Sequence, residues 1–136
     1  MATYNKFNAT VEDLAQGVHD FANDQLVVAL TNTAPAAGNS TLADLTEIDY
    51  TNLSSRDITT TTSEQTTGTY QLTLADLTLT ASGGEVGPFR YVVVYNSTPA
   101  NDPLIAWFDR GDSITLNDGE SITIDFDDEN GLFQLA

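Results

Sequence analysis

The sequence has no cysteine, one histidine and very few basic residues. Of its 136 residues, 20 are Asp or Glu and only 4 are Lys or Arg, which gives a formal net charge of −16. Without cysteine the chain can form no disulfide framework, zinc ribbon or iron–sulfur site. Because His19 is the sole imidazole, it is the one residue that could serve as the histidine of a Ser-His-Asp site.

The scarcity of cations also limits the partners of the chain. Proteins that bind DNA or RNA take much of their affinity from Lys and Arg, and anionic membrane surfaces attract the same side chains. We therefore expect no nucleic-acid partner and no membrane association. Residues 1–10 contain one lysine and no apolar run, so we expect a soluble protein without a secretion signal, made in the cytoplasm. Abundant Asp with little Lys also suits a high-salt host, which would explain the surface without indicating a function.

The remaining composition is sufficient for a core, since 40% of the residues are hydrophobic. The length lies near the common domain size of about 100–150 residues, which predicts a single β domain over residues 1–136. Residues 1–9 are expected to form an extended N-terminal arm. A helix is predicted over about residues 10–19, with Thr10 as its N-cap. His19 would then be a partly exposed histidine at the helix end.

Most of the other periodic segments predict β-strands. The predicted strands are residues 25–31, 70–74, 77–80, 89–95, 104–108, 114–116, 121–126 and 132–135. Residues 89–95 are apolar on both faces, which is typical of a central strand. Gly87-Pro88 is interpreted as a turn, and Asn117-Asp118-Gly119 as the turn of a hairpin between residues 114–116 and 121–126. About seven short strands with turns between them predict an all-β fold, an antiparallel β-sandwich or jelly roll with a short N-terminal helix.

One long segment, residues 32–68, breaks this pattern. Residues 43–48 could form a helical turn capped by Thr41, and residues 59–62 are a run of threonines. A segment of this length without strong periodicity is usually functional or mobile. We interpret it as a long loop or arm, and edge strands or an arm that reaches a neighbouring molecule fit it equally well.

The densest acidic run suggests a calcium site. It comprises Asp125, Asp127, Asp128 and Glu129. An EF-hand loop needs Gly at its sixth position and Glu at its twelfth, but counting from Asp125 these positions hold Asn130 and Ala136. Strand alternation instead points residues 122, 124 and 126 to the core and the carboxylates to solvent. A looser calcium site that uses Asp109, Asp112 or Asp118 stays open as an alternative.

Other chemical signatures are weak. Arg110-Gly111-Asp112 is an integrin-type tripeptide, but a turn between two strands explains it as well. Residues 82–87 are glycine-rich but lack the lysine and the helix of a phosphate loop. The aromatic residues of the predicted strands could form a sugar platform or pack in the core, and we favour the core. They are Phe89, Tyr91, Tyr95, Trp107 and Phe108. No carboxylate pair stands out for glycoside hydrolysis. We therefore expect no enzyme activity and no catalytic, cofactor-binding or metal site.

Several segments together resemble a group of small virion proteins from tailed bacteriophages and prophages. The resemblance keeps its order along nearly the whole chain. The segments that carry it are Met1–Asn8, Glu12–His19, Val28–Pro35, Leu42–Ile48, Gly87–Tyr91, Asn96–Pro99 and Ser113–Glu120. No catalytic motif is among them.

The resemblance implies a structural particle component, which we take to be a decoration or cement protein on the outer head surface. Such proteins assemble as oligomers, often trimers, against the major capsid protein. The strands that are apolar on both faces suggest that one face packs the core and the other a neighbouring subunit. Repulsion between subunits of charge −16 should make salt or divalent cations favour assembly. The alternative is a carbohydrate- or receptor-binding module of a tail or fibre. A cell-wall hydrolase is a third hypothesis.

Overall fold

A computed structural model of the chain describes residues 3–136. The elements follow in the order β1 (Thr3–Lys6), α1 (Asn8–Ala15), β2 (Leu26–Thr31), the 3-10 helix η1 (Leu42–Asp44), β3 (Asp57–Ile58), β4 (Thr60–Thr66), β5 (Thr69–Leu74), β6 (Leu77–Thr80), β7 (Val86–Asn96), β8 (Leu104–Leu116), β9 (Ser121–Ile124) and β10 (Phe133–Leu135). No helix in this described part has the length and apolar character needed to cross a membrane.

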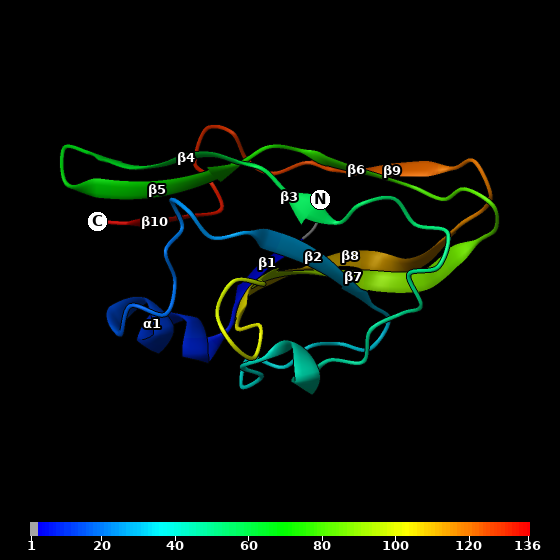
Figure 1. Cartoon of the computed structure of the whole chain (residues 1–136), viewed down its shortest axis with the longest axis horizontal. Helices are drawn as coiled ribbons and strands as arrows, with labels where there is room; N and C mark the ends of the chain where they lie inside the picture. The colour runs from blue at the N-terminus through cyan, green and yellow to red at the C-terminus, as the bar shows by residue number, and fades with distance from the viewer. Residues whose placement is uncertain (1–2) are drawn as a thin grey trace.

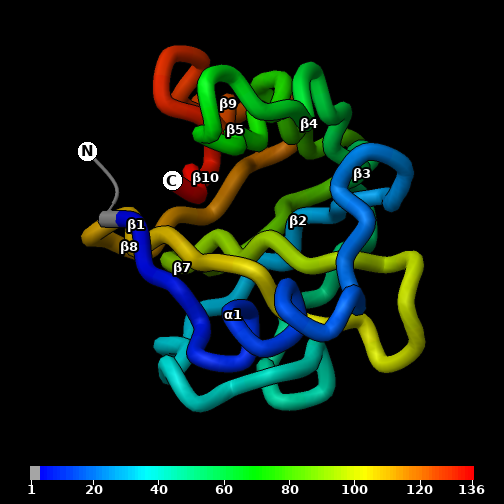
Figure 2. The backbone as a smooth tube through the Cα atoms, turned by 90° about the vertical axis from the view of Figure 1, so that its left-hand side faces the viewer, coloured from blue at the N-terminus to red at the C-terminus, as the bar shows by residue number. Residues whose placement is uncertain are grey.

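The strands stack in two layers (Figure 1). One layer is a five-stranded antiparallel sheet in the order β1-β8-β7-β2-β3. The other contains two smaller antiparallel sheets, β10-β5-β4 and β6-β9. Helix α1 and the segment around η1 lie on the opposite side of the five-stranded sheet in both views (Figures 1 and 2). The predicted antiparallel all-β sandwich with one short N-terminal helix is therefore confirmed.

The main core fills the space between the two layers. From the five-stranded sheet, alternate residues of β2 and β7 point into it: Leu26, Val28, Leu30, Val92 and Val94. Leu72, Leu74 and Leu79 meet them from the second layer, each with no exposed surface. Full burial of such a side chain contributes about 1.5–3 kcal/mol to folding, so this contact dominates the stability of the sandwich.

The second face of the five-stranded sheet is covered by the chain itself. The intervening residues of β2 and β7, Val27, Ala29, Val93 and Tyr95, form a smaller cluster with Phe7 and Leu104. Leu42 and Leu45, from η1 and the residue after it, and Trp107 pack against this cluster. The inference that the second apolar face packs a neighbouring subunit is therefore wrong: strands apolar on both faces here indicate a sheet buried on both sides within one molecule.

The predicted arms turn out to be parts of the sandwich. Of the predicted N-terminal arm over residues 1–9, residues 1 and 2 lie outside the described part and residues 8 and 9 belong to α1. Residues 3–6 are extended, as expected, but they pair with β8 as the edge strand of the five-stranded sheet. Within residues 32–68, the edge-strand alternative holds for the second half: β3 pairs with β2, and β4 pairs with β5. The first half crosses the second face of the sheet. There Thr41 does begin the helical turn, because the Asp44 carboxylate accepts its backbone N–H, but the turn ends at Asp44 rather than continuing to residue 48.

Helix α1 begins and ends earlier than its sequence pattern predicts. It spans Asn8–Ala15, and Thr10 lies inside it rather than at its N-cap. The Thr10 hydroxyl faces the carbonyl oxygens of Leu104 and Ile105, at 3.0 and 2.9 Å, and so anchors the helix to the start of β8. After Ala15 the chain leaves the helix, and Gly17 takes a left-handed conformation with φ +75°, a C-terminal position that favours glycine.

Two predicted turns lie inside long strands instead. Gly87-Pro88 is part of β7, where the register with β8 shifts between Val86 and Phe89. Residues 110–112 are part of β8. Tyr91 pairs with Asp109 whereas Phe89 pairs with Ile114, so β8 has more residues than β7 between these two pairs and bulges there. The predicted hairpin between residues 114–116 and 121–126 is also wrong, since β8 pairs with β7 while β9 pairs with β6. The chain changes layers at residues 117–120 instead of reversing within one sheet.

Candidate functional site

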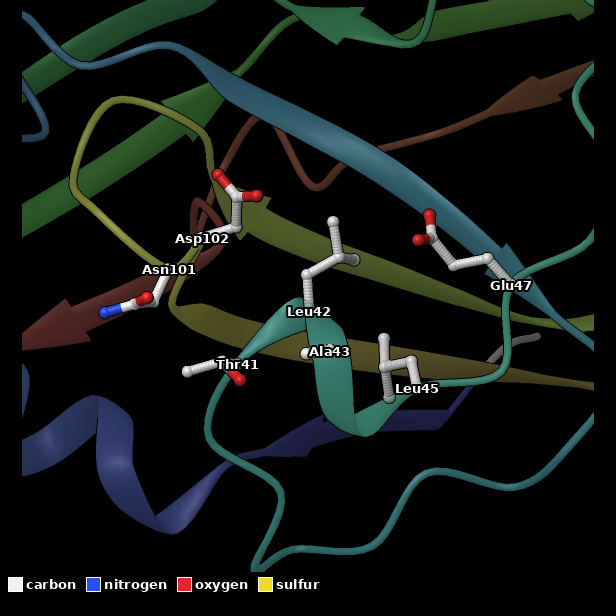
Figure 3. A pocket seen from close by; sticks show the side chains of 7 residues that line it. All are labelled: Thr41, Leu42, Ala43, Leu45, Glu47, Asn101 and Asp102. Atoms are coloured by element: carbon white, nitrogen blue, oxygen red, sulfur yellow. The ribbon is translucent and has the colours of Figure 1, made fainter.

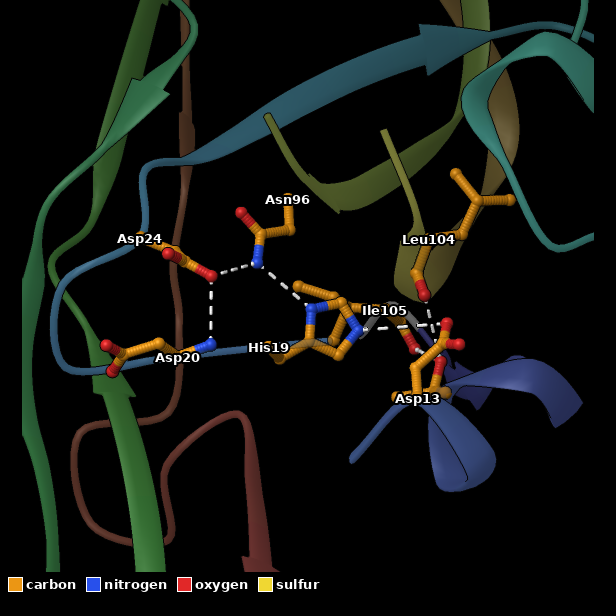
Figure 4. Close-up of polar contacts among 8 residues, drawn as sticks. Asp13, His19, Asp20, Asp24, Asn96, Leu104 and Ile105 are labelled. Atoms are coloured by element: carbon orange, nitrogen blue, oxygen red, sulfur yellow. Dashed lines mark hydrogen bonds and ion pairs between the residues drawn. The ribbon is translucent and has the colours of Figure 1, made fainter. Parts of the chain in front are cut away.

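The one histidine of the chain lies at the centre of a buried polar network (Figure 4). His19 follows α1 in the linker to β2, and its side chain has no exposed surface. The ring stacks on Phe21 with 4.9 Å between centroids and an interplanar angle of 13°. The residue as a whole stays partly exposed, as expected, but its imidazole is buried and it does not lie at the helix end. The helix stops four residues earlier, and the linker folds the imidazole inward.

The partners of His19 fix which ring nitrogen carries the proton. Asn96, buried at the end of β7, places its Nδ2 3.0 Å from Nδ1 of His19 and 2.7 Å from a carboxylate oxygen of Asp24. The Asn96 Oδ1 accepts the backbone N–H of Thr98, so both amide hydrogens point at His19 and Asp24. Nδ1 must therefore be the acceptor, and the neutral ring carries its hydrogen on Nε2.

This arrangement opposes protonation of the ring. Burial lowers the pKa of His19, and the Asp13 and Asp24 carboxylates raise it less strongly. A second hydrogen on Nδ1 would point at the Asn96 amide donor. Nε2 is buried and has no hydrogen-bond partner in the described part of the chain; its nearest carboxylate oxygen, on Asp13, is 4.0 Å away. Burial and the Asn96 donor therefore both favour the neutral imidazole.

Next to His19 a groove opens between α1 and the strand layer that carries the C-terminal strand. We call it the α1–β10 groove. Its lining residues are Leu14, His19, Asp20, Phe21, Ala22, Ser63, Tyr70 and Leu135, and its volume is about 290 Å³. This volume lies just below the range for ligand sites, about 300–1,000 Å³. Phe133 packs beside the lining, with its ring centroid 5.4 Å from Phe21 and 5.9 Å from Tyr70.

A second, larger hollow lies beneath the five-stranded sheet, between η1 and the β7–β8 loop (Figure 3). It has a volume of about 440 Å³, and its lining residues are Thr41, Leu42, Ala43, Leu45, Glu47, Asn101 and Asp102. Figure 3 shows the Asp102 and Glu47 carboxylates on either side of Leu42 rather than converging. Glu47 already accepts a hydrogen bond from the Tyr50 hydroxyl at 2.6 Å, and this bond and burial of the ring raise the pKa of Tyr50.

The C-terminal acidic run lies on the surface, as strand alternation predicts. Phe126 is buried, whereas Asp125 and Asp127 are exposed. Asp127 caps the following turn by accepting the backbone N–H groups of Glu129 and Asn130, which lowers its pKa. Asp125 faces the Asp76 carboxylate, and that like charge raises the pKa of Asp125.

The carboxylates of the looser calcium hypothesis have separate partners. Asp109 forms a two-pronged ion pair with Arg90, at 2.8 and 3.0 Å, and this contact lowers the pKa of Asp109. Asp118 accepts the backbone N–H of Gly83, while Asp112 is exposed and offers its backbone carbonyl to Arg110. Across residues 3–136 no group of three or more His, Asp or Glu side chains is placed to hold a metal ion.

The remaining sequence candidates do not come together as a binding surface. Phe89 and Tyr95 are buried on opposite faces of the five-stranded sheet. Trp107 is partly buried and packs on Phe7, with 4.5 Å between ring centroids. Phe108 packs instead between Tyr4 and Phe126. The aromatic set therefore belongs mainly to the core, as expected, and forms no common platform.

The glycine-rich segment wraps around a neighbouring loop rather than a ligand. The backbone N–H of Ser82 bonds to the Asn52 carbonyl, and a Cβ at Gly84 would lie 2.5 Å from the Asn52 side chain. A side chain at Gly84 would therefore displace the end of the Asn52 side chain. This packing agrees with the sequence-based view that residues 82–87 are not a phosphate loop.

The residues that matter most around His19 could not be found from sequence. Asn96 is 77 positions from His19 and 72 from Asp24, and no motif joins them. A signal was present only in retrospect: Asn96 ends a largely apolar strand, where a polar residue that is buried needs partners.

Comparison of the chain with protein-family models, with curated proteins and with solved structures found no match.

Proposed function

We propose that this chain is a structural, non-catalytic component of a bacteriophage virion, a decoration or cement protein that binds the major capsid protein on the outer surface of the head. The observation that carries the proposal is the ordered series of segments, from Met1–Asn8 to Ser113–Glu120, that resembles small virion proteins of tailed phages and prophages. These segments run through the strands, the η1 region and the turns of the sandwich. The resemblance therefore concerns a whole scaffold rather than one local motif.

The charge distribution supports a place on the outside of the head. The chain carries a net charge of −16, and three of its cations are engaged within the molecule. Arg90 pairs with Asp109, Arg56 donates to the Val28 carbonyl and lies 3.6 Å above the Tyr50 ring, and Arg110 donates to a backbone carbonyl. A surface of this sign is repelled by packaged DNA and is tolerated on the outer face of a shell.

The edges of the sandwich support self-assembly. Because the second face of the large sheet is covered by the chain itself, subunit contacts have to use other surfaces. Strands β1 and β3 end the five-stranded sheet, and β4 ends the three-stranded one. Edge strands offer unpaired backbone N–H and C=O groups to a neighbouring strand. We propose a homo-oligomer joined at such edges, with a trimer as the first arrangement to test.

The test is to locate the chain in intact particles. Particles of the phage or prophage that encodes the chain should be purified, analysed by mass spectrometry and reconstructed by cryo-electron microscopy. We expect density for the sandwich on the exterior of the head, in a fixed ratio to the major capsid protein. Absence of the chain from purified particles would overturn the virion proposal, and density on the tail or neck would overturn the head assignment.

A second measurement tests the cementing role. Particles with and without the chain should be heated in steps and then sedimented, because a cement protein raises the temperature at which the head releases its DNA. Mutual repulsion of the subunits predicts that low salt and a chelator weaken attachment. Equal heat resistance of the two kinds of particle would show that the chain does not stabilise the head and would contradict the cementing role.

A further inference from the structure

The α1–β10 groove combines an apolar floor with exposed apolar walls. Phe21 and Tyr70 form the floor together with the neighbouring Phe133 ring. Leu14 lines the groove from α1, and Leu135 lines it from β10 with 50% of its surface exposed. In Figure 1 these two elements lie at the same end of the molecule, α1 below and β10 above. Apolar side chains that line one groove together, unlike a single exposed side chain, are typical of a contact surface.

One carboxylate lines this groove, and two more lie close to its lining residues. Asp20 lines it directly and contributes to the raised pKa of the Tyr70 hydroxyl. Behind it, the Asp24 carboxylate accepts the backbone N–H of Asp20. Asp13 lies 4.0 Å from the ring of His19, which is itself a lining residue. No lysine or arginine is among the residues that line the groove.

We propose that the α1–β10 groove is the docking site for a basic and aliphatic segment of a partner protein, one that inserts a leucine-like side chain flanked by Lys or Arg. The apolar side chain would fill the space between Leu14 and Leu135, and the flanking cations would meet Asp13 and Asp20. Charge complementarity steers such a partner to the site and repels acidic competitors. This inference deepens the proposed function and rests on it for the identity of the partner, a protein of the same particle.

A second copy of this chain does not fit the groove. Its arginines are held by partners of their own. Lys6 is its remaining cation, and the neighbouring Phe7 has no exposed surface and cannot be inserted. The partner is therefore a different protein with a local excess of positive charge.

The first experiment uses peptide probes with the isolated full chain. A peptide of alternating lysine and leucine is titrated into the isotope-labelled protein and followed by amide chemical shifts. Peptides of lysine and serine, and of glutamate and leucine, serve as controls. We expect saturable shifts of Leu14, Ala22, Tyr70 and Leu135 with the first peptide alone. Shifts scattered over the whole acidic surface, equal binding of the lysine–serine peptide, or no saturable binding would overturn the proposal.

Two matched variants separate groove binding from general attraction by charge. Leu135→Asp and Val11→Asp each add one carboxylate at an apolar side chain about half exposed, 50% and 53%, but Val11 does not line the groove. Groove binding predicts at least tenfold weaker affinity for Leu135→Asp and a change below twofold for Val11→Asp. Unspecific attraction predicts that both variants bind more tightly. If Leu135→Asp does not fold, Ala22→Phe, which obstructs the groove from the exposed linker, should show the same loss.

The same variants on particles distinguish the two proposals. Attachment of the wild-type chain and of Val11→Asp, with loss of Leu135→Asp, supports the groove as the capsid contact. Equal attachment of all three overturns the groove as that contact and leaves the virion function intact. Peptide binding in the groove, with no chain on the particles, overturns the virion function and retains the groove as a binding site.

Discussion

Replacing Asn96 by alanine should remove about 3–4 kcal/mol from the free energy of unfolding. The Asn96 side chain is fully buried and takes part in three hydrogen bonds, at 2.7 Å to Asp24, 3.0 Å to His19 and 3.1 Å from the Thr98 N–H. A bond to a charged group contributes about 1.5–3 kcal/mol and a neutral bond about 1 kcal/mol. Water that enters the cavity recovers part of this loss at Asp24, so the expected value lies below the largest total.

The assay is urea unfolding at pH 7.5, followed by far-UV circular dichroism and by the fluorescence of Trp107, the single tryptophan. With a urea dependence of about 1.5–2 kcal/mol per molar, the midpoint of Asn96→Ala should fall by about 2 M. The control is Asn23→Ala, since Asn23 bonds to Asp20 on the surface and its loss should change stability by about 0.5 kcal/mol or less. A loss below about 1 kcal/mol for Asn96→Ala, or equal losses for both variants, would refute the buried network.

Three further predictions concern pH, a buried hydroxyl and two glycines. The pKa of His19 is lowered in the folded chain, whereas a histidine of the unfolded chain has a pKa of about 6.5, so the folded chain binds fewer protons at this residue. The stability that depends on neutral His19 should therefore be complete above pH 6.5 and fall as the pH drops below it. A His19→Gln variant whose stability keeps the same slope against pH between about pH 5 and 6.5 would contradict this. Thr10→Val should lower the free energy of unfolding by about 1 kcal/mol, because valine cannot donate a hydrogen bond to the two carbonyls at the start of β8. Urea unfolding measures this loss, and an unchanged midpoint would contradict the role of the Thr10 hydroxyl in anchoring α1 to β8. Gly131 and Gly17 share φ +75°, but a Cβ at Gly131 would collide with the Leu72 carbonyl, whereas nothing lies within 4 Å of a Cβ at Gly17. Gly131→Ala should therefore lower the free energy of unfolding by roughly 2–3 kcal/mol and Gly17→Ala by about 1 kcal/mol. Similar losses in thermal unfolding would show that the backbone conformation, and not the collision, sets the cost.

Much of the fold could be predicted because strand signals are local. Residues 25–31 became β2, and residues 70–74 and 77–80 became β5 and β6, since alternation and β-branched residues favour a half-buried strand wherever it pairs. Residues 89–95 became part of the central strand β7. Threonine-rich β4 was predicted only as one alternative for residues 32–68, because its residues are mostly exposed and an edge strand needs no apolar alternation.

The errors in the turns have a common physical cause. Gly and Pro permit a turn but also permit a bulge, and only the pairing of the strands decides between them. Gly111 is thus part of a bulge in β8 whose shape is held by Asp109, which accepts its N–H and pairs with Arg90. Similarly, Asn117–Gly119 carries a turn sequence, but the strands on its two sides pair with different partners.

The sequence by itself determined the class of this protein: an acidic, cysteine-free chain whose apolar periodicity specifies an antiparallel sandwich, and whose carboxylates fall mainly in turns and loops. These properties are set by residue type and short spacing. Tertiary structure alone decided that both faces of the large sheet are covered within one molecule, and that His19 meets Asn96 and Asp24 in a partly buried network. It also decided that Leu14 and Leu135, from opposite ends of the chain, line one acidic groove. Contacts between residues 70 to 120 positions apart depend on the stacking of whole layers, which no local pattern encodes.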